Sequence, residues 1–218
     1  MVFTCVPTAD VEKVYPRERF PHVEFLPTLT GYVPLGLPRT TNSLQQRRFL
    51  IAYRGHSLPY WYGDLGQEKL LIGRRMKAIC EQRGLRVDIE WEDAQRIYGS
   101  NWYGFLQSAR ATLGTESGAN VFDEHGAIRK AVEAALRENP SLDYAEVRAR
   151  FLAPHEGRIR MNQISPKIFE AIACRTALVL FEGEYSQVVE PNVHYVPLKK
   201  DFSNVDDVLS KLQNDAFV

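Results

Sequence analysis

The residues with the clearest potential for binding chemistry lie in one stretch, "ISPKIFEAIACRTALVLFEGEYS", which runs from Ile164 to Ser186. The pair Ser165-Pro166 is typical of a sharp helix start, because serine is a good N-cap and proline suits the first helical position. The first backbone N–H groups of such a helix have no partner within it, and they carry the positive end of the helix dipole. The pattern therefore predicts an anion site at this helix start, of the kind that receives phosphate.

Glu170 lies one turn deeper in the same predicted helix, on the face of Pro166. A carboxylate there repels phosphate, but it can accept two hydrogen bonds from a vicinal diol such as a ribose beside the phosphate. The acid of dinucleotide-binding folds performs the same chemistry from a different position. The other interpretation is a helix-start glutamate that the dipole stabilises by about 0.3–1 kcal/mol. The residues alone leave both interpretations open.

Two further segments place polar groups after predicted strands. Arg54 and Lys69 flank a glycine-containing loop, where an arginine and a lysine can bind phosphate, although they also fit a surface arginine and a helix-start lysine. Residues 115–118 include Glu116 and Ser117, which can bind a polar ligand or form a turn. Both segments are candidates for the same site.

The elements that must position these residues begin at Arg48, where short apolar runs start to alternate with helical patterns. This alternation predicts the α/β class, with a Rossmann-like parallel sheet and helices on both faces. In such sheets ligands bind at the carboxyl ends of the strands. The predicted strands lie within 48–55, 85–90, 111–118, 176–183 and 194–198, and the predicted helices within 67–84, 91–110 in pieces around Gly99, the segment from Ser165, and the segment from Ser203.

The rest of the chain suggests the domain organisation. Residues 1–46 are rich in proline and glycine, so we expect an irregular linker or the tail of something larger, before one domain over 47–218. Residues 119–158 interrupt the alternating pattern and predict two amphipathic helices that cover one side of the core. The aromatic run 60–62 is either core or an exposed apolar face for self-association.

Composition excludes several classes of protein. Lys plus Arg and Asp plus Glu both number 27 in 218 residues, so no net charge favours nucleic acid as a partner. The 3 cysteines have neither metal-ligand nor redox spacing, which favours a reducing, cytoplasmic location and no metal site. No apolar run reaches the length of about 18 residues that a membrane span needs. Motifs for a P-loop, a standard dinucleotide site and a hydrolase nucleophile elbow are absent from the sequence.

Four segments in the same order resemble a known family. They are similar to a bacterial branch of the GT-B glycosyltransferases of the "glycosyl transferases group 1" kind, and together they span roughly residues 48 to 210. The resemblance implies the carboxyl-terminal, nucleotide-sugar-binding domain of a two-domain enzyme, cytoplasmic or peripheral to the inner membrane. The segments are "YRGHSLPYWYGDLGQEKLLIG", "ATLGTESGANVFD", "ISPKIFEAIACRTALVLFEG" and "EPNVHYVPLKKDFSNVDDVL".

The resemblance also implies roles for the candidate residues. Glu170 matches the glutamate that holds the ribose, and Ser165 with the backbone around Ile164 matches the segment that meets the donor phosphates. Arg54 and Lys69 match the basic pair that neutralises the departing diphosphate, which implies no metal or other cofactor. The implied partners are a nucleoside-diphosphate sugar and a glycan or similar acceptor, with the acceptor domain supplied by a separate chain or by self-association.

The chain departs from the family pattern at named positions. Asn162 replaces a second glutamate of many retaining members, and Arg175 and Ala177 replace a glycine and a proline. Residues 1–46 would be only the last piece of the acceptor domain and the crossover. We therefore keep two alternatives to a glycosyltransferase donor-binding half. One is a non-catalytic nucleotide or nucleotide-sugar binding module, and the other is an unrelated flavodoxin-like fold with no nucleotide.

Overall fold

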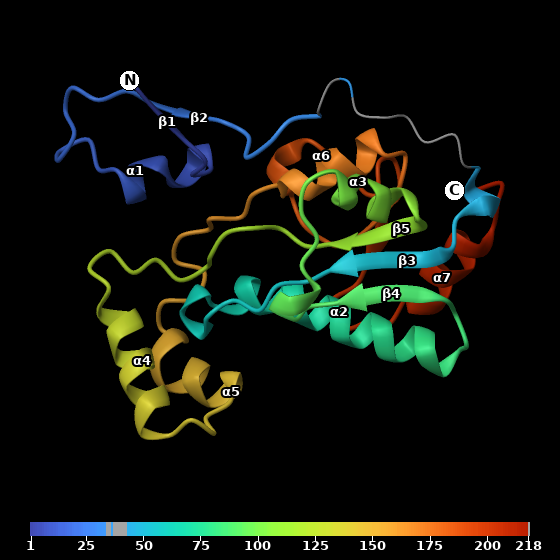
Figure 1. Ribbon diagram of the computed structural model, residues 1–218. Helices are drawn as coiled ribbons and strands as arrows, with labels where there is room; N and C mark the ends of the chain where they lie inside the picture. The colour runs from blue at the N-terminus through green and yellow to red at the C-terminus, as the bar shows by residue number, and fades with distance from the viewer. Residues whose placement is uncertain (34–35, 37–42, 218) are drawn as a thin grey trace. The chain divides into compact units, whose positions relative to one another are not determined.

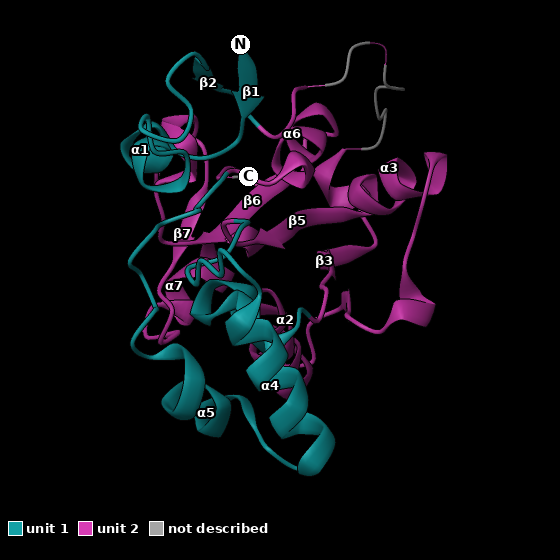
Figure 2. Cartoon of the chain, turned by 90° about the vertical axis from the view of Figure 1, so that its left-hand side faces the viewer, with its two compact units in different colours: residues 1–29, 58–68, 117–163 teal, residues 30–57, 69–116, 164–218 magenta. Residues whose placement is uncertain are grey.

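The computed structural model describes residues 1–33, 36 and 43–217. The chain forms two compact units (Figure 2), and each unit combines segments that are far apart in the sequence. Unit 1 contains Met1–Leu29, Leu58–Glu68 and Ser117–Gln163, and unit 2 contains Thr30–Ser57, Lys69–Glu116 and Ile164–Val218. Unit 1 therefore joins residues from the expected linker with the whole expected insertion 119–158 and with Leu58–Glu68.

Unit 2 is built on a five-stranded sheet in which every neighbouring pair of strands is parallel (Figure 1). This confirms the predicted α/β class and the Rossmann-like parallel sheet. The order across the sheet is β4-β3-β5-β6-β7. The strands are β3 (Phe49–Arg54), β4 (Val87–Glu90), β5 (Ala109–Gly114), β6 (Ala177–Phe181) and β7 (Val196–Leu198).

The strand order has a topological switch point. The first strand of the sheet, β3, has the second strand, β4, on one side and the third strand, β5, on the other. This is the 2-1-3-4-5 order of flavodoxin-like sheets, in which ligands bind where the chain leaves the first and third strands in opposite directions. The topology therefore predicts a ligand site at the carboxyl ends of β3 and β5.

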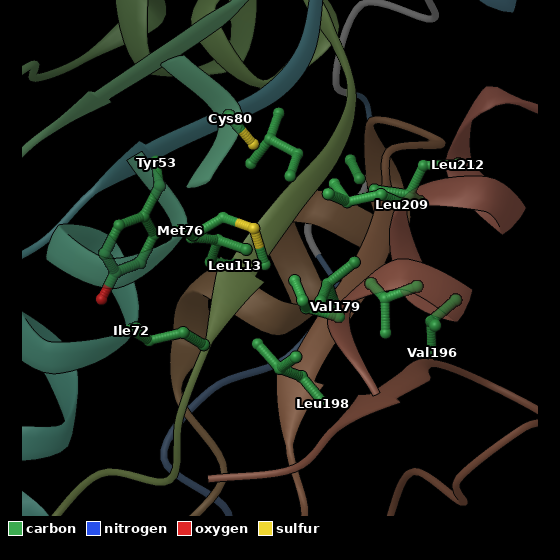
Figure 3. Close-up of a cluster of buried hydrophobic side chains, with 14 of the residues drawn as sticks. Tyr53, Ile72, Met76, Cys80, Leu113, Val179, Val196, Leu198, Leu209 and Leu212 are labelled. Atoms are coloured by element: carbon green, nitrogen blue, oxygen red, sulfur yellow. The ribbon is translucent and has the colours of Figure 1, made fainter. Parts of the chain in front are cut away.

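One face of the sheet is covered by α2 (Asp64–Gln82), from Lys69 onwards, and by α7 (Val205–Gln213). Ile72, Met76 and Cys80 recur at four-residue spacing and are fully buried, so α2 presents one continuous apolar stripe to the strands. Figure 3 shows these side chains with those of the strands and of α7 in a single buried cluster. This cluster is the main core of unit 2.

The opposite face is covered by α3 (Ser100–Gln107) and α6 (Pro166–Ala173). Strand β6 shows the alternation directly, because Leu178 and Leu180 pack toward α6 whereas Val179 and Phe181 join the cluster with α2 and α7. Helices therefore cover both faces, as predicted. The amino-terminal ends of α3 and α6 both lie at the carboxyl edge of the parallel strands, since each of these helices runs antiparallel to the strand that follows it.

Arg47 links the elements at the other edge of the sheet. Its guanidinium is buried and donates hydrogen bonds to the Ala109 carbonyl at 2.7 Å, the Thr176 hydroxyl at 3.0 Å and the Cys174 carbonyl at 3.2 Å. Burial lowers the pKa of this guanidinium. Arg47 thus connects the start of β3 to β5 and to the turn between α6 and β6.

Unit 1 holds the expected pair of helices. Helix α4 (Ala127–Glu138) and helix α5 (Tyr144–Val147), which continues as a π-helical turn over Arg148–Leu152, form a separate apolar cluster within unit 1. Tyr60 and Trp61 are partly buried in this cluster, which agrees with the core interpretation of the aromatic run. The apolar faces that the pattern of 119–158 predicts are therefore packed within unit 1.

The amino-terminal segment is more regular than expected. Strand β1 (Val2–Thr4) pairs in parallel with β2 (Phe25–Pro27), and α1 (Val11–Val14) lies between them in the chain. Tyr15 stacks on Phe25 with ring centroids 4.3 Å apart. Residues 34, 35 and 37–42 of the expected linker, including Pro34 and Pro38, lie outside the described residues.

Candidate functional site

The carboxyl end of β3 faces the first turn of α6. Helix α6 begins with Ser165 as N-cap and Pro166 in the first turn, as the sequence predicts. Ser165 has the extended backbone of an N-cap, but its hydroxyl makes no capping hydrogen bond to the helix. The hydroxyl expected at the anion site is therefore present at the helix start and is not used to close it.

Lys167, in this first turn, contacts the end of β3. Its Nζ donates a 3.0 Å hydrogen bond to the carbonyl of Arg54 and lies 5.3 Å from the centroid of the Trp102 ring. Among the residues that the structure describes, no carboxylate forms an ion pair with Lys167. The Lys167 side chain is exposed, so its desolvation at the strand end is only partial. This desolvation first, and then the charge of Lys69, lower the pKa of Lys167, with Glu170 opposing and Arg96 adding to the shift.

His56 and Arg96 lie together at the adjacent ends of β3 and β4. The Nη2 of Arg96 is 2.5 Å from the Nδ1 of His56, and Arg96 also forms a 2.8 Å ion pair with the exposed carboxylate of Asp93. Burial lowers the pKa of His56, and the charges of Arg96, Lys69 and Lys167 lower it further against the opposing charge of Asp93. The imidazole of His56 is therefore neutral near pH 7.

Lys69 belongs to the same group of charges, since it influences the pKa of both His56 and Lys167. Its own pKa is lowered by burial. The Lys69 carbonyl accepts a 2.9 Å hydrogen bond from the hydroxyl of Tyr53, which fixes this part of α2 on β3. We call His56, Lys69, Arg96 and Lys167 the basic cluster.

Arg54, the other predicted phosphate ligand, has its guanidinium directed into the protein. Its Nη1 pairs with the Asp88 carboxylate at 2.7 Å, and its Nε donates to the Gln95 carbonyl at 2.9 Å. Only 11% of the side chain is exposed, and the guanidinium lies 4.3 Å from the centroid of the Phe105 ring. Arg54 thus holds the segment that carries Arg96 instead of presenting its own charge at the edge.

Glu170 lies one turn into α6, as predicted. Its Oε2 accepts a 2.7 Å hydrogen bond from the indole Nε1 of Trp102, which belongs to α3. The Trp102 ring stacks on Phe105 with centroids 5.5 Å apart, so the donor itself is held in place. The carboxylate is half-buried and has a fixed orientation beside the basic cluster, whose Lys167 it influences electrostatically.

Ile164 and Ser117 have backbone partners. The Ile164 amide donates to the Ser186 hydroxyl at 3.2 Å, and its carbonyl accepts from the Thr30 hydroxyl. Ser117, in unit 1, exchanges two 2.8 Å backbone hydrogen bonds with Gln163 in an antiparallel bridge. The backbone of Ser117 is therefore held in an isolated antiparallel bridge.

Glu116 is buried at the carboxyl end of β5. Its Oε1 accepts hydrogen bonds from the backbone amides of Tyr185 at 2.8 Å and Glu184 at 3.2 Å, in the loop that follows β6. A Cβ at Gly183 would lie 2.7 Å from Oε2 of Glu116, so only glycine allows this approach. The carboxylate orders the loop beside β5, which is the structural role that a buried, hydrogen-bonded glutamate commonly has.

His56, Arg96 and Lys167 were missed by the sequence reasoning. His56 directly follows the glycine after a predicted strand, which was an available signal. Lys167 lies 3 positions before Glu170, on the helix already singled out. Arg96 gave no such signal, since its approach to His56 depends on the pairing of β3 with β4.

Two negative findings complete the description of residues 1–33, 36 and 43–217. Within these ranges no group of three or more His, Cys, Asp or Glu side chains is arranged to hold a metal ion. No helix in the same ranges is long and apolar enough to cross a membrane.

Comparison of the chain with protein-family models, with curated proteins and with solved structures finds no match in any of the three. The family resemblance therefore stays a prediction from the sequence segments quoted above.

Proposed function

We propose that unit 2 binds a nucleoside-diphosphate sugar at the carboxyl end of β3, as the donor-binding half of a glycosyltransferase. The observation that supports this most is the convergence of the basic cluster and Glu170 beside the topological switch point of the sheet. Cations and an oriented carboxylate side by side suit a ligand that has both phosphate and a diol.

The phosphate part of the proposal depends on the basic cluster. Desolvation is the largest cause of the lowered pKa of His56 and of Lys167, and cations from α2, from the segment after β4 and from α6 lower both pKa values further. A bound diphosphate would reduce the repulsion between these cations. Its electrostatic interaction with the cluster would be more favourable than with an isolated surface lysine. The unused hydroxyl of Ser165 at the start of α6 is a further donor for a phosphate oxygen.

The ribose part depends on Glu170. One carboxylate oxygen is engaged by Trp102, which leaves the other oxygen as the acceptor for a ribose hydroxyl. A carboxylate that is already oriented loses less conformational entropy when it binds a diol.

In glycosyl transfer, the bond between the sugar and the terminal phosphate oxygen breaks while the acceptor oxygen forms a bond to the same carbon. Negative charge develops on the departing diphosphate, and the basic cluster would stabilise it without a metal. The acceptor, a glycan or a similar hydroxyl compound, would be bound by a separate acceptor domain. No residue of this chain is assigned as catalytic.

A second candidate is a module that binds a nucleotide or nucleotide sugar without turnover. Asn162, at the position of the second glutamate of many retaining relatives in the resembling family, favours it. Turnover of a donor after addition of an acceptor-binding half would favour the transferase over the module. The flavodoxin-like alternative, which the strand order keeps open, requires that no nucleotide binds.

Calorimetric titration of the full chain with UDP, GDP, ADP and CMP tests the proposal. Selective binding of one nucleoside diphosphate is the expected result, and it would identify the base. Absence of binding for all of them would overturn the proposal and leave the flavodoxin-like alternative.

A further inference from the structure

We propose that the outer edge of β1 is a self-association surface, at which two copies of this chain pair antiparallel about a twofold axis at Phe3. The occupant of this edge is a second copy of the chain, and the joined strands form one continuous sheet in the order β2-β1-β1-β2. The inference concerns unit 1 and is independent of the nucleotide site proposed for unit 2.

The first observation is that β1 is paired on one side. On the side of β2, the Val2 amide donates a 2.7 Å hydrogen bond to the Glu24 carbonyl (Figure 2). The Thr4 carbonyl accepts a 2.8 Å hydrogen bond from the Thr28 amide. Because successive residues of a strand direct their backbone groups to opposite edges, the N–H and the carbonyl of Phe3 point away from β2. Among the described residues, no backbone group bonds to Phe3 on this outer side.

The two outward groups of Phe3 are complementary to themselves. In an antiparallel pair of strands, two directly opposite residues exchange both of their N–H···O bonds. Phe3 of a second copy, related by a twofold axis, would therefore accept from this N–H and donate to this carbonyl. The backbone groups at the outer edge of β1 thus suit an isologous contact, in which the same surface serves both copies.

The second observation is that Pro27 closes the opposite edge of the strand pair. Pro27 stands opposite Thr4 in the register, and the alternation places its ring nitrogen on the outer side of β2. A proline at that position has no N–H to donate and obstructs a neighbouring strand, which is how natural edge strands avoid further pairing. Pairing at β1 alone therefore gives a closed dimer and not an open array of strands.

The third observation is that the segment around β1 has no charged side chain. The sequence from Met1 to Ala9 contains no Asp, Glu, Lys, Arg or His. Each residue on a twofold axis faces its own copy, so a charged side chain there would meet a like charge and destabilise the contact. Edge strands that avoid pairing commonly carry such charges. The uncharged edge therefore favours a second copy of the chain over an acidic or basic partner.

The side chains of β1 agree with this pairing. Thr4 is buried, and its Oγ1 donates a 3.4 Å hydrogen bond to the hydroxyl of Tyr15, which stacks on Phe25. Phe3 projects from the opposite face of the strand and is 68% exposed. Directly opposite residues of an antiparallel pair project to the same face, so the Phe3 rings of two copies would lie side by side. Cross-strand aromatic pairs of this kind stabilise sheets.

Sedimentation equilibrium of the full chain over a range of concentrations tests the inference. The wild type should show a reversible equilibrium between monomer and dimer. Phe3→Pro removes the outward N–H and keeps the bonds of Val2 and Thr4 to β2, because an edge strand tolerates proline where the N–H faces solvent. Phe3→Lys and Phe3→Glu place like charges at the axis. Each of the three variants should weaken dimerisation at least about tenfold.

An equimolar mixture of Phe3→Lys and Phe3→Glu separates lost pairing from lost folding. Pairing at Phe3 would bring the opposite charges of the two variants together, so the mixture should dimerise more strongly than either variant alone. An unfolded variant could not recover in this way. Val193→Lys is the control, because Val193 is a 70% exposed valine of unit 2, and this variant should dimerise like the wild type.

Three results would overturn the inference. The first is a wild type that stays monomeric at every concentration. The second is a dimer that the Phe3 variants leave unchanged or that Val193→Lys weakens equally, since the contact would then lie elsewhere or depend on net charge. The third is a mixture of the two charged variants that dimerises no better than either alone.

Discussion

The indole Nε1 of Trp102 donates a 2.7 Å hydrogen bond to Oε2 of Glu170, and this bond joins α3 to α6 at the carboxyl edge of the sheet. Hydrogen bonds to a charged acceptor contribute about 1.5–3 kcal/mol. The same bond sets the direction of the carboxylate that we propose as the ribose ligand.

Trp102→Phe should therefore affect binding and stability together. The variant keeps an aromatic ring on Phe105 but removes the donor, so Glu170 loses its fixed orientation. We expect nucleotide affinity to fall by about fivefold and the free energy of unfolding by about 1–2 kcal/mol. Titration calorimetry and urea denaturation measure the two effects.

Trp91→Phe is the control, because Trp91 is a half-buried indole in the cluster under α2. It should lower stability without changing nucleotide affinity. Unchanged affinity in Trp102→Phe as well would show that the bond between Trp102 and Glu170 is structural only.

Arg47→Met should be strongly destabilising. The substitution leaves the carbonyls of Ala109 and Cys174 without their buried donor, and the methionine cannot replace the bond to Thr176. We expect the free energy of unfolding to fall by about 3 kcal/mol, as for other broken buried polar networks. Urea denaturation measures this loss of stability. Arg48→Met is the control, because it changes an exposed arginine. Equal denaturation midpoints for the two variants would contradict the prediction.

Lys167→Met should stabilise the fold at pH 7. The folded protein disfavours the charged form of Lys167, because its pKa is lowered to about 8, so below the ordinary value of 10.5 the charge costs free energy. After allowance for solvent screening we expect a gain of about 1 kcal/mol. Denaturation at pH 7 and pH 10 should show the gain shrinking at the higher pH, whereas a loss of stability at pH 7 would mean that the contact with the Arg54 carbonyl dominates.

Glu156 in unit 1 should give a pH-dependent contribution to stability. Its Oε1 accepts a 3.1 Å hydrogen bond from the Asp64 amide at the start of α2. Burial first, and then the Asp64 charge, raise the pKa of Glu156 above 4.5, while the Asp64 amide and Arg148 oppose the shift. Because the folded pKa is raised, the stabilisation is full below about pH 4.5 and is lost as the pH rises through the folded pKa.

The Glu156→Gln variant has no carboxyl group at this position, so it should not lose stability as the pH rises through the folded pKa of Glu156. Its free energy of unfolding relative to the wild type should increase between pH 4 and pH 7, as measured by urea denaturation at intervals of pH. Glu138→Gln, at an exposed position of α4, controls for the change in total charge. A difference between Glu156→Gln and wild type that stays constant with pH would contradict the assignment.

The helix start at Ser165-Pro166 and the five strands could be predicted from the sequence, because caps and apolar runs are local signals. The contact between Arg54 and Asp88 could not be predicted, since Asp88 lies on the neighbouring strand β4 and only the strand order brings the two residues together. The approach of Arg96 to His56 has the same cause.

The packing partners of α4 and α5 also could not be predicted from the sequence. Their apolar faces were identified, but a 3.6-residue period does not say whether a helix covers a sheet or another helix. In the structure these faces meet each other and Trp61 within unit 1.

The claim that Glu170 holds the ribose is tested most directly by a double-mutant cycle that includes the ligand. The affinities of wild type and Glu170→Gln are measured by calorimetry for the selected nucleoside diphosphate and for its 2′-deoxy analogue. We predict that the wild type prefers the ribose form by about 1–3 kcal/mol, that Glu170→Gln loses most of this preference, and that stability changes little, because the glutamine can still accept the Trp102 bond. An equal preference for the ribose form in both proteins would contradict the claim.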